Sequence, residues 1–480
     1  MAMEKYNLAV IGSGPGGYLA AIRAAQLGMK VVIIERDKPG GVCLNWGCIP
    51  SKAILKCAEI YEYFKKSDSY GINIKGLSFD YSKVIDRSRK ASSTLSKGVE
   101  FLFKKNGIAH LQGTGKLISR NKIAIIGTKN QNEVEAENVL IATGSVPKTL
   151  PGLEIDGRFV ITSDEAIFSK DFPESIVIIG GGYIGAEFAY VYNAFGSTVT
   201  IVEMESHLLP GADSEVALEL ERNFKKSGIT ILTNTKYNNY KKLNGSLNVI
   251  VEDISSKELK EIKTSKLMVA VGRKAVANTA STSLSFYESS DDLGLKDLNI
   301  ELDEQGFIKT NGSYRTTCSN VYAIGDVIGP PLLAHKASEE GIAAVESISG
   351  KDGTRVHYDR IPSCVYCQPE IASVGITEDV AKEKGLKINV GKFPFRASGK
   401  AVAAGATDGF VKIISDSKTG EILGTHIIGH GATDLIAEIG VAQTLEATPL
   451  EIALTPHAHP TLSEAVMEAA LSALGRARNI

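Results

Sequence analysis

The 480-residue sequence predicts an α/β protein with two Rossmann-like dinucleotide-binding domains and a further α+β domain at its C-terminal end. Three observations lead to this prediction. The length corresponds to about three domains at roughly 150 residues each. A strand, a glycine-rich loop, a helix and a second strand follow one another twice. After about Val356 the pattern becomes a mixture of short strands and helices.

The composition narrows the class of protein. The chain has 53 Lys and Arg against 55 Asp and Glu, and neutralising nucleic-acid phosphates would need a clustered cationic excess that is absent. No apolar run is long enough for a transmembrane helix, and the N-terminus shows no secretory or transit-peptide pattern. We therefore expect a cytoplasmic bacterial protein or, alternatively, the mature form of a mitochondrial matrix protein.

The first glycine loop lies between two short apolar segments. Leu8 to Ile11 reads as a strand, Gly12 to Gly17 as the loop and Tyr18 to Leu27 as a helix. A second strand, Val31 to Ile34, ends at Glu35. This order is typical of the start of a dinucleotide-binding βαβ unit.

The second glycine loop repeats that order. Ile176 to Ile179 leads into Gly180 to Gly185, a helix-like stretch from Ala186 to Phe195, and a strand from Val199 to Val202 that meets Glu203. One such loop is a weak signal because glycine-rich turns are common. Two loops, each between a strand and a helix and each followed by a strand and a glutamate, are a strong one.

Each loop has the residues that a pyrophosphate needs. The first glycine permits a tight turn, the second allows close approach of the backbone, and the third allows the helix to pack on the strand. The phosphates then meet the N-terminus of the helix. Glu35 and Glu203 can accept hydrogen bonds from a ribose diol, and Glu203 would repel a 2′-phosphate. We expect two adenine dinucleotides without that phosphate, one held tightly and one exchanging.

Two cysteines, Cys43 and Cys48, stand just before a predicted helix in which Pro50 suits an early position. The helix N-terminus favours the thiolate of Cys48, and so close a pair can cycle between dithiol and disulfide. The alternatives are two buried small residues or half of a zinc site, although no further ligands lie nearby. Cys364 and Cys367 lie in a strand-like stretch, which favours a structural role.

Other segments connect these motifs. We expect helices from Lys52 to about Lys105, short strands over residues 108–143 and an exposed loop from Ala280 to Asp292.

Near the C-terminus, His459 is a candidate general base, and Glu464 could hold the tautomer of its imidazole. Alone, this last pattern would more often be a helix-entry turn with a satisfied histidine.

Together these motifs make the whole chain, from Val10 to about Arg478, resemble the pyridine nucleotide–disulfide oxidoreductases of the flavoprotein type. The segments that carry the resemblance are Gly12–Gly17, Cys43–Lys52, Ala142–Gly144, Gly180–Glu187, Gly325–Asp326, Leu333–Ala337 and His459–Glu464. The resemblance implies a first domain for FAD over residues 1–150, a second for NAD over 151–278, a central segment over 279–353 that returns to the FAD domain, and an interface or dimerisation domain over 354–480.

The resemblance also implies roles for individual residues. Cys48 would face the flavin and Cys43 would exchange with substrate. Lys52 and Glu187 would form an ion pair beside the flavin, and His459, oriented by Glu464 and followed by a cis peptide bond, would serve the disulfide of the other subunit. The residues implied to bind the cofactors FAD and NAD are Gly12, Gly14, Gly17, Glu35, Lys52, Thr143, Gly144, Gly325, Asp326, Ala334, Gly180, Gly182, Gly185, Glu203 and Gly272; no metal is implied.

Within the family, the chain is most similar to the lipoamide-oxidising members. Glu203 differs from the NADP-dependent glutathione reductases, and Leu333–Ala337 is similar to the lipoamide enzymes. This implies oxidation of protein-bound dihydrolipoamide with reduction of NAD⁺, in a homodimer that meets the lipoyl domains and the E2 subunit-binding domain of 2-oxo acid dehydrogenase complexes, or a glycine cleavage system. Two features depart from the family. Gly272-Arg273 is followed by Lys274–Asn278 and the polar insert Ala280–Asp292 instead of the usual Pro-Asn, and Cys364 and Cys367 stand where related enzymes usually carry other residues.

Two alternatives remain. The chain could be another NAD(P)H-linked disulfide reductase of the same family, or a non-catalytic flavoprotein used in redox sensing. The intact Cys43, Cys48, His459 and Glu464 weigh against the second alternative.

Overall fold

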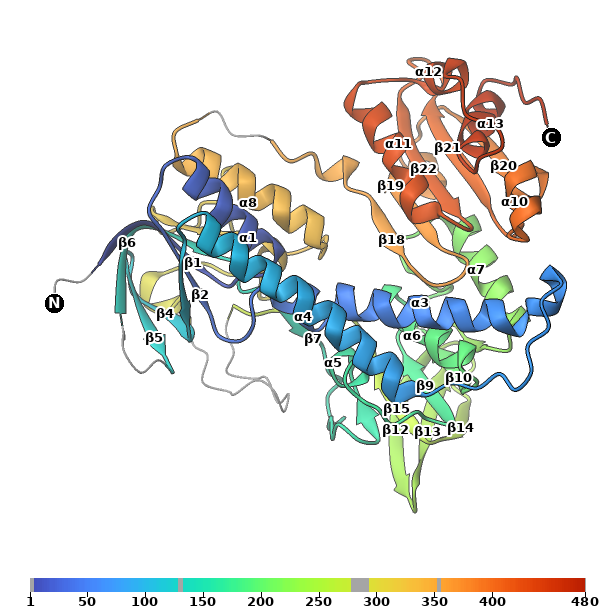
Figure 1. Ribbon diagram of the computed structural model, residues 1–480, viewed down its shortest axis with the longest axis horizontal. Coiled ribbons are helices and arrows are strands. Elements are labelled where there is room, and N and C mark those ends of the chain that lie inside the picture. Colours follow the sequence, from blue (N-terminus) through green and yellow to red (C-terminus); the bar gives the residue numbers. More distant parts are fainter. Residues whose placement is uncertain (1–3, 128–132, 278–292, 352–354, 480) are drawn as a thin grey trace. The chain divides into compact units, whose positions relative to one another are not determined.

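The computed structural model describes residues 4–127, 133–277, 293–351 and 355–479. The chain forms two compact units, each assembled from three separate stretches of sequence (Figure 1). The first unit takes residues 1–54, 80–171 and 272–356, and the second takes 55–79, 172–271 and 357–480. The expected loop from Ala280 to Asp292 lies outside the described residues.

The first unit is built on a sheet whose strands run in the order β3-β2-β1-β6-β5-β4, with β17 paired to β6. The strands around β1 are parallel, and Leu8 to Ile11 of β1 is buried throughout, as expected for a strand covered on both faces. The strands are β1 (Lys5–Ile11), β2 (Val31–Glu35), β3 (Ala109–Gln112), β4 (Thr114–Ser119), β5 (Lys122–Ile126), β6 (Glu133–Ile141) and β17 (Val321–Ala323).

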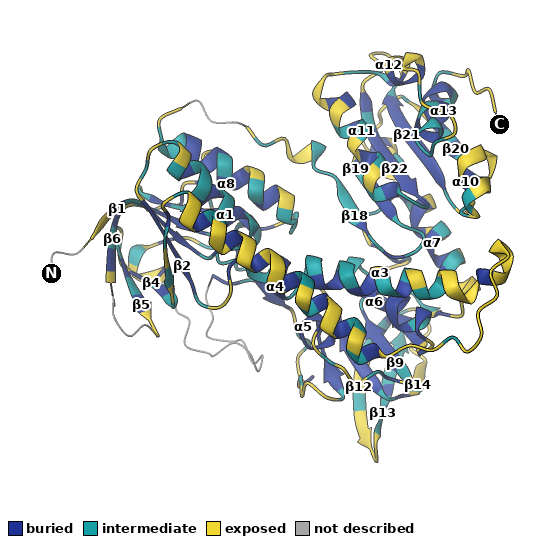
Figure 2. Cartoon of the chain, viewed as in Figure 1, coloured by how far each residue is buried: buried dark blue, intermediate teal, exposed yellow. Residues whose placement is uncertain are grey.

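Three helices of the first unit share a hydrophobic core with this sheet. They are α1 (Pro15–Gln26), α4 (Tyr81–Lys105) and α8 (Ala334–Ile348). Buried and exposed residues alternate along α4, whose buried positions recur every three or four residues (Figure 2). The smaller elements are α2 (Gly41–Asn45), β7 (Ser145–Pro147), β8 (Val160–Ile161), α5 (Ser163–Ala166), β16 (Arg273–Ala275), η2 (Lys296–Leu298) and η3 (Gly325–Ile328). Helix α3 (Cys48–Lys65) begins in the first unit and ends in the second.

The second unit contains its own parallel sheet, in the order β11-β10-β9-β15. Its elements are β9 (Ser175–Ile179), α6 (Tyr183–Ala194), β10 (Thr198–Val202), α7 (Ser214–Lys226), β11 (Thr230–Leu232) and β15 (Lys266–Val269). An antiparallel sheet of β12 (Thr235–Leu243), β13 (Ser246–Asp253) and β14 (Leu259–Thr264) is inserted between β11 and β15. The order β9-α6-β10 thus repeats β1-α1-β2 of the first unit.

The C-terminal part of the second unit is an antiparallel sheet in the order β18-β19-β22-β21-β20. Its strands are β18 (Ser363–Val365), β19 (Ile371–Gly375), β20 (Ile388–Pro394), β21 (Phe410–Asp416) and β22 (Ile422–Ile428). The remaining elements of this unit are η1 (Ser67–Tyr70), η4 (Tyr358–Arg360), α9 (Glu378–Glu383), η5 (Phe395–Ala397), α10 (Gly399–Ala404), α11 (Ala432–Thr444), α12 (Pro449–Leu454) and α13 (Glu464–Ala473). Helices α11 to α13 share the core of this sheet.

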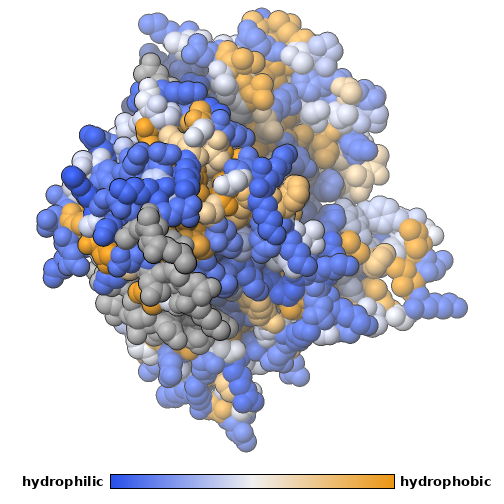
Figure 3. Space-filling view, turned by 60° about the vertical axis from the view of Figure 1, so that its left-hand side comes forward, coloured by the Kyte–Doolittle hydropathy of each residue, from blue (hydrophilic) through white to orange (hydrophobic). Residues whose placement is uncertain are grey.

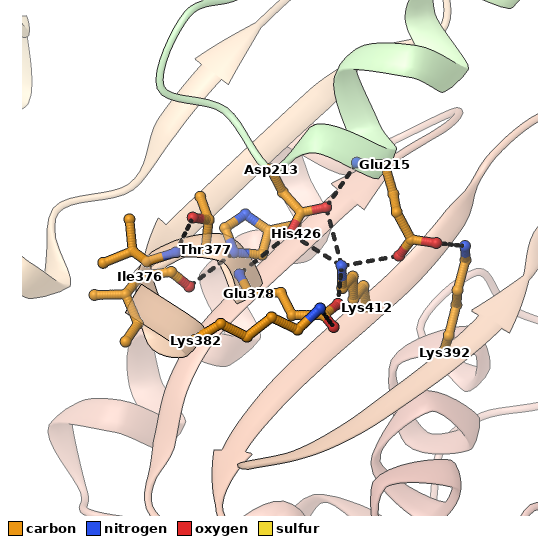
Figure 4. A network of polar contacts seen from close by, with 10 residues as sticks. Asp213, Glu215, Ile376, Thr377, Glu378, Lys382, Lys392, Lys412 and His426 are labelled. Carbon is orange, nitrogen blue, oxygen red and sulfur yellow. Dashed lines mark hydrogen bonds and ion pairs between the residues drawn. The ribbon is translucent and has the colours of Figure 1, made fainter. Parts of the chain in front are cut away.

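Within the second unit, a buried lysine joins the C-terminal sheet to the start of α7 (Figure 4). Lys412 on β21 is 1% exposed, and its Nζ lies 3.0 Å from Asp213 Oδ2, 2.8 Å from Glu215 Oε2 and 2.6 Å from Glu378 Oε2. Burial lowers the pKa of Lys412, but the hydrogen bonds that its ammonium group donates to the carboxylates of Glu215 and Glu378 outweigh this effect and raise the pKa above its usual value. Lys412 therefore stays charged.

Most of the surface in Figure 3 carries hydrophilic side chains, with hydrophobic ones in separate groups. Among the residues that the structure describes, no helix is long and apolar enough to span a membrane.

Two helices begin earlier than the sequence predicts. Helix α1 begins at Pro15 rather than Tyr18, and α6 begins at Tyr183 rather than Ala186. The glycine before each helix, Gly14 or Gly182, is the N-cap, so residues that read as loop already form the first turn. The sequence predicts that Cys43 and Cys48 stand just before a helix, whereas Cys43 lies inside the short helix α2 and Cys48 is the first residue of α3.

Candidate active site

The first glycine loop joins β1 to α1 and forms a close turn. Gly12 has φ of +100°, and a Cβ there would lie 2.4 Å from the carbonyl oxygen of Ala142. A Cβ on Gly17 would lie 2.1 Å from the carbonyl oxygen of Gly12. Gly14 caps α1 without any side-chain hydrogen bond, and a Cβ there would meet nothing within 4 Å. The N-cap of α1 therefore has room beside it and no side-chain cap, as a pyrophosphate site requires.

The second glycine loop has the same geometry. Gly180 has φ of +103°, and a Cβ on Gly185 would lie 2.0 Å from the carbonyl oxygen of Gly180. Gly182 caps α6 without a side-chain hydrogen bond and has open space beside it. Both loops therefore fit the pyrophosphate of a dinucleotide.

The two glutamates that follow the loops bind them in the same way. Glu35 Oε2 accepts the N–H of Ser13 at 2.8 Å, and Oε1 accepts the N–H of Asp37 at 2.9 Å. Glu203 Oε2 accepts the N–H of Gly181 at 2.6 Å, and Oε1 accepts the N–H of Glu205 at 3.0 Å. Backbone N–H groups therefore fix both glutamates, and their contact with a ribose remains a prediction.

Asp326 lies in the η3 turn of the first unit, and its side chain is held from one side. Asp326 Oδ2 accepts the hydroxyl of Ser145 at 2.5 Å, and Ser145 in turn accepts a hydrogen bond from Arg273 Nε at 2.7 Å. Thr143 donates its hydroxyl to the carbonyl oxygen of Val276 at 2.7 Å, and Gly144 has φ of +73°. Gly272, with φ of +101°, stands just before Arg273, while Ala334 is the first residue of α8.

The cysteine pair brings two helix ends together in the first unit. Cys43 lies in α2 and Cys48 is the first residue of α3. A hydrogen bond to Cys48, together with burial, raises the pKa of the Cys43 thiol, while the positive charge of Lys52 lowers it. In the dithiol form, the negative charge is therefore better placed on Cys48, at the N-terminus of α3, than on Cys43.

The histidine and its carboxylate lie together in the second unit. Glu464 Oε1 lies 2.9 Å from His459 Nδ1, and its other oxygen accepts the N–H of Thr461 at 2.8 Å. These hydrogen bonds, that of Thr461 most of all, lower the pKa of Glu464. An ionised Glu464 holds the proton on Nδ1 and leaves Nε2 as the acceptor. The His459 side chain is 79% exposed, and the peptide bond to Pro460 is cis as the sequence predicts.

The sequence prediction missed residues that support the predicted ones. His457 has Nε2 2.8 Å from Glu438 Oε1 and Nδ1 2.8 Å from the carbonyl oxygen of Thr455, which fixes the segment before His459. Ser145 likewise supports a predicted residue, because its hydroxyl donates to Asp326 and itself accepts a hydrogen bond from Arg273. The only sequence signal for either set is that the residues adjoin a motif already singled out.

Lys52 and Glu187, which the sequence predicts to form an ion pair, belong to different units. Lys52 lies one helical turn after Cys48 on α3 in the first unit. Glu187 is buried on α6 in the second unit, where its Oε1 accepts the N–H of Tyr366 at 3.1 Å. Their pairing remains a prediction.

Comparison with known proteins places these features in a family. The sequence profile of the pyridine nucleotide-disulphide oxidoreductases matches residues 6–341, and the profile of their dimerisation domain matches residues 361–470. The chain belongs to this family. The dimerisation domain supports the expected homodimer.

Relatives of known name match nearly the whole chain. The dihydrolipoyl dehydrogenase of Chlorobaculum parvum is 45% identical over 473 residues, which cover 98% of this chain and 97% of that protein. The dihydrolipoyl dehydrogenase of Bacillus subtilis is 43% identical over 491 residues, covering 99% of each. The crystal structure of LpdA from Mycobacterium tuberculosis superimposes with a TM-score of 0.88 at 26% identity, covering 97% of this chain and 99% of that one. The predicted fold class and family resemblance are confirmed.

Proposed function

We propose that this protein is a dihydrolipoyl dehydrogenase, which oxidises dihydrolipoamide to lipoamide and reduces NAD⁺ to NADH. The observation that carries the proposal is the Cys43–Cys48 pair, in which Cys48 is the first residue of α3 and Cys43 lies in the short helix α2. Relatives that share 40–45% of its sequence over almost its full length bear this name.

The enzyme uses FAD and NAD. The open first loop, with Gly12, Gly14, Gly17 and Glu35, is the proposed site of the FAD pyrophosphate and ribose. The second loop, with Gly180, Gly182, Gly185 and Glu203, is the proposed NAD site. Thr143, Gly144, Gly272, Gly325, Asp326 and Ala334 complete the proposed cofactor contacts. When bound, FAD supplies an acceptor for the electron pair of the dithiol and a hydride donor for NAD⁺.

The thiol chemistry follows from the two cysteines and the histidine. His459 Nε2 takes the proton from one thiol of dihydrolipoamide, and the thiolate attacks Cys43 of the disulfide, so that Cys48 leaves as a thiolate. The second substrate thiol then displaces Cys43, which takes up a proton, and lipoamide departs. The substrate has lost two protons and two electrons, and the enzyme holds a dithiol. The N-terminus of α3 stabilises the Cys48 thiolate.

The exposed His459 supports action across a dimer. Its imidazole is 79% exposed, although Glu464 already fixes its tautomer. We propose that His459 serves the disulfide of the other subunit in a two-fold dimer.

We also propose that the partners of this protein are lipoyl domains and the E2 subunit-binding domain of 2-oxo acid dehydrogenase complexes. Its similarity to bacterial relatives supports a place in the bacterial cytoplasm.

An anaerobic assay of NADH formation tests this proposal. The purified protein is given dihydrolipoamide with NAD⁺ or NADP⁺, and glutathione serves as the control thiol. We expect turnover with dihydrolipoamide and NAD⁺ alone, because Glu203 repels a 2′-phosphate. A flavin-loaded protein that ignores dihydrolipoamide would contradict the substrate and favour another disulfide reductase of the family.

Two variants assign the roles. His459→Gln should lower dihydrolipoamide turnover by roughly 10²–10⁴, the usual contribution of a general base. Cys43→Ser should abolish that turnover but leave the flavin reducible by NADH, because Cys43 only meets the thiol substrate. Near-normal turnover of His459→Gln, or loss of flavin reduction in Cys43→Ser, would show that these roles are wrong.

A further inference from the structure

The η3 turn that carries Asp326 packs against a charged pair that is completely enclosed in the first unit. Lys336 and Glu340 lie one turn apart on α8, and their side chains are 1% and 0% exposed. Lys336 Nζ lies 3.1 Å from Glu340 Oε1. No role in the proposed reaction accounts for this pair.

The remaining bonds of the pair go to the two ends of the turn. Lys336 Nζ donates to the carbonyl oxygen of Gly325 at 3.0 Å and to that of Gly329 at 2.9 Å. Glu340 Oε2 accepts the N–H of Gly325 at 2.8 Å. The three donors of the ammonium group therefore have three acceptors, and both oxygens of the carboxylate are used.

The turn needs such support because both ends are glycines. Gly325 has φ of +77° and Gly329 has φ of +110°, conformations in which glycine restricts the backbone little. Asp326 lies between them. The bond from Ser145 fixes its carboxylate, while Lys336 and Glu340 fix the backbone that carries it.

Stability alone is a weak reason for a buried ion pair. Removing two charges from water is so unfavourable that well-packed apolar residues often stabilise a protein as much or more. A fully bonded buried pair instead defines one geometry for the groups around it. Here those groups are the ends of a single turn.

We infer that Lys336 and Glu340 are positioning residues, which hold the turn of Asp326 in its flavin-binding conformation before FAD arrives. This inference depends on the proposed contact of Asp326 with FAD. It explains why the Leu333–Ala337 segment contains a lysine, since Lys336 donates hydrogen bonds to both ends of the turn that follows β17.

The rate of FAD release tests the inference. The holoenzyme is placed in a chaotropic salt below its unfolding concentration, and release is followed by flavin fluorescence, with the visible absorbance band as a second readout. Lys336→Met should release FAD about tenfold faster, as expected when roughly 1.4 kcal/mol of binding free energy is lost. Glu340→Gln keeps an acceptor for the Gly325 N–H and should release FAD only about threefold faster.

Lys412→Met is the matched control. Lys412 is an equally buried lysine, and its partners Asp213, Glu215 and Glu378 belong to the second unit. This variant should lower the unfolding temperature but release FAD at the wild-type rate. Faster release from Lys412→Met to the same degree as from Lys336→Met would reduce the effect to general destabilisation and overturn the inference.

Asp326→Ala separates this inference from the proposed function. If Asp326→Ala speeds release but Lys336→Met and Glu340→Gln do not, the positioning role is wrong and the FAD site stands. If Asp326→Ala also leaves release unchanged, the proposed contact with FAD is wrong. Should Lys336→Met not fold, unchanged release from Glu340→Gln overturns the inference by itself.

Discussion

The two glycine loops are built alike but packed differently. Both end in a glycine N-cap, both lead into a helix of 12 residues, and both are bound by a glutamate through the same two backbone N–H groups. The loops differ at their second, fourth and fifth positions, and the difference that changes the packing is the fifth, which is Gly16 in the first loop and Ile184 in the second.

Gly16 marks the place where a second helix covers the first loop. A Cβ on Gly16 would lie 2.7 Å from the carbonyl oxygen of Ala337, and a Cβ on Gly341 would lie 2.5 Å from the carbonyl oxygen of Gly16. Helix α8 thus packs directly on the start of α1. Ile184 is only half-buried and has a full side chain in the corresponding place.

This difference explains how two glycine loops of the same geometry can bind one nucleotide that stays and one that exchanges. The first loop packs against α8, and Lys336 and Glu340 of the same helix hydrogen-bond to the turn of Asp326. Such a loop suits a cofactor that stays bound. A loop without that cover suits one that exchanges at each turnover. The two functions then depend on what packs around the motif rather than on the motif itself.

The largest effect should come from filling the third glycine of each loop. A Cβ at Gly17 or Gly185 meets a backbone oxygen near 2 Å, so either alanine variant must distort its loop, at about 3 kcal/mol or more. Gly17→Ala should lose FAD and its yellow colour. Gly185→Ala should stay yellow and lose NADH formation. Flavin absorbance and turnover distinguish them, and a yellow, fully active Gly17→Ala would contradict the first cradle.

Substitution of Asp164 should change the stability of the first unit in a pH-dependent way. Burial raises the pKa of Asp164 in the first unit to about 6. A raised carboxyl pKa stabilises the fold below the unfolded value of 3.8, and this contribution is lost as the pH rises through 6. Asp164→Asn should therefore stabilise the first unit at pH 8, by up to roughly 3 kcal/mol, and have little effect at pH 4.

The measurement for Asp164→Asn is the temperature at which FAD is released, taken at both pH values. Release should shift upward at pH 8 only. An equal shift at pH 4 would mean that Asp164 does not titrate as described.

The smallest effect should come from the fifth position. Gly16→Ala forces α8 away from α1 and should weaken FAD retention, at about 1–3 kcal/mol. Ile184→Ala removes a half-buried side chain from the second loop and should leave FAD retention unchanged. Equal FAD release from both variants would remove the distinction between a covered and an open loop.

Much of the site could be predicted because its signals are local. The glycine loops, Glu35 and Glu203, and the Cys43–Cys48 pair each lie within a short stretch whose spacing reflects its chemistry. The supporting contacts could not be predicted in this way. Ser145 and Asp326 are 181 residues apart, and only the folded sheet brings them together.

Other features were ambiguous for physical reasons. Lys336 and Glu340 have the spacing of an ordinary surface pair on a helix, and nothing in the sequence shows that both are enclosed. The sequence predicts the starts of α1 and α6 three residues late because their glycine-rich first turns read as loop; in α1 these residues include Pro15, which suits the beginning of a helix.

Retention of the two nucleotides tests the comparison most directly. The purified enzyme is incubated with NAD⁺, passed through a desalting column, and analysed for FAD and NAD⁺ in the protein fraction. The packing of α8 on the first loop predicts that FAD remains bound while NAD⁺ is left behind on the column. If both nucleotides remained with the protein, or both were lost, the packing of α8 on the first loop would not explain which cofactor stays.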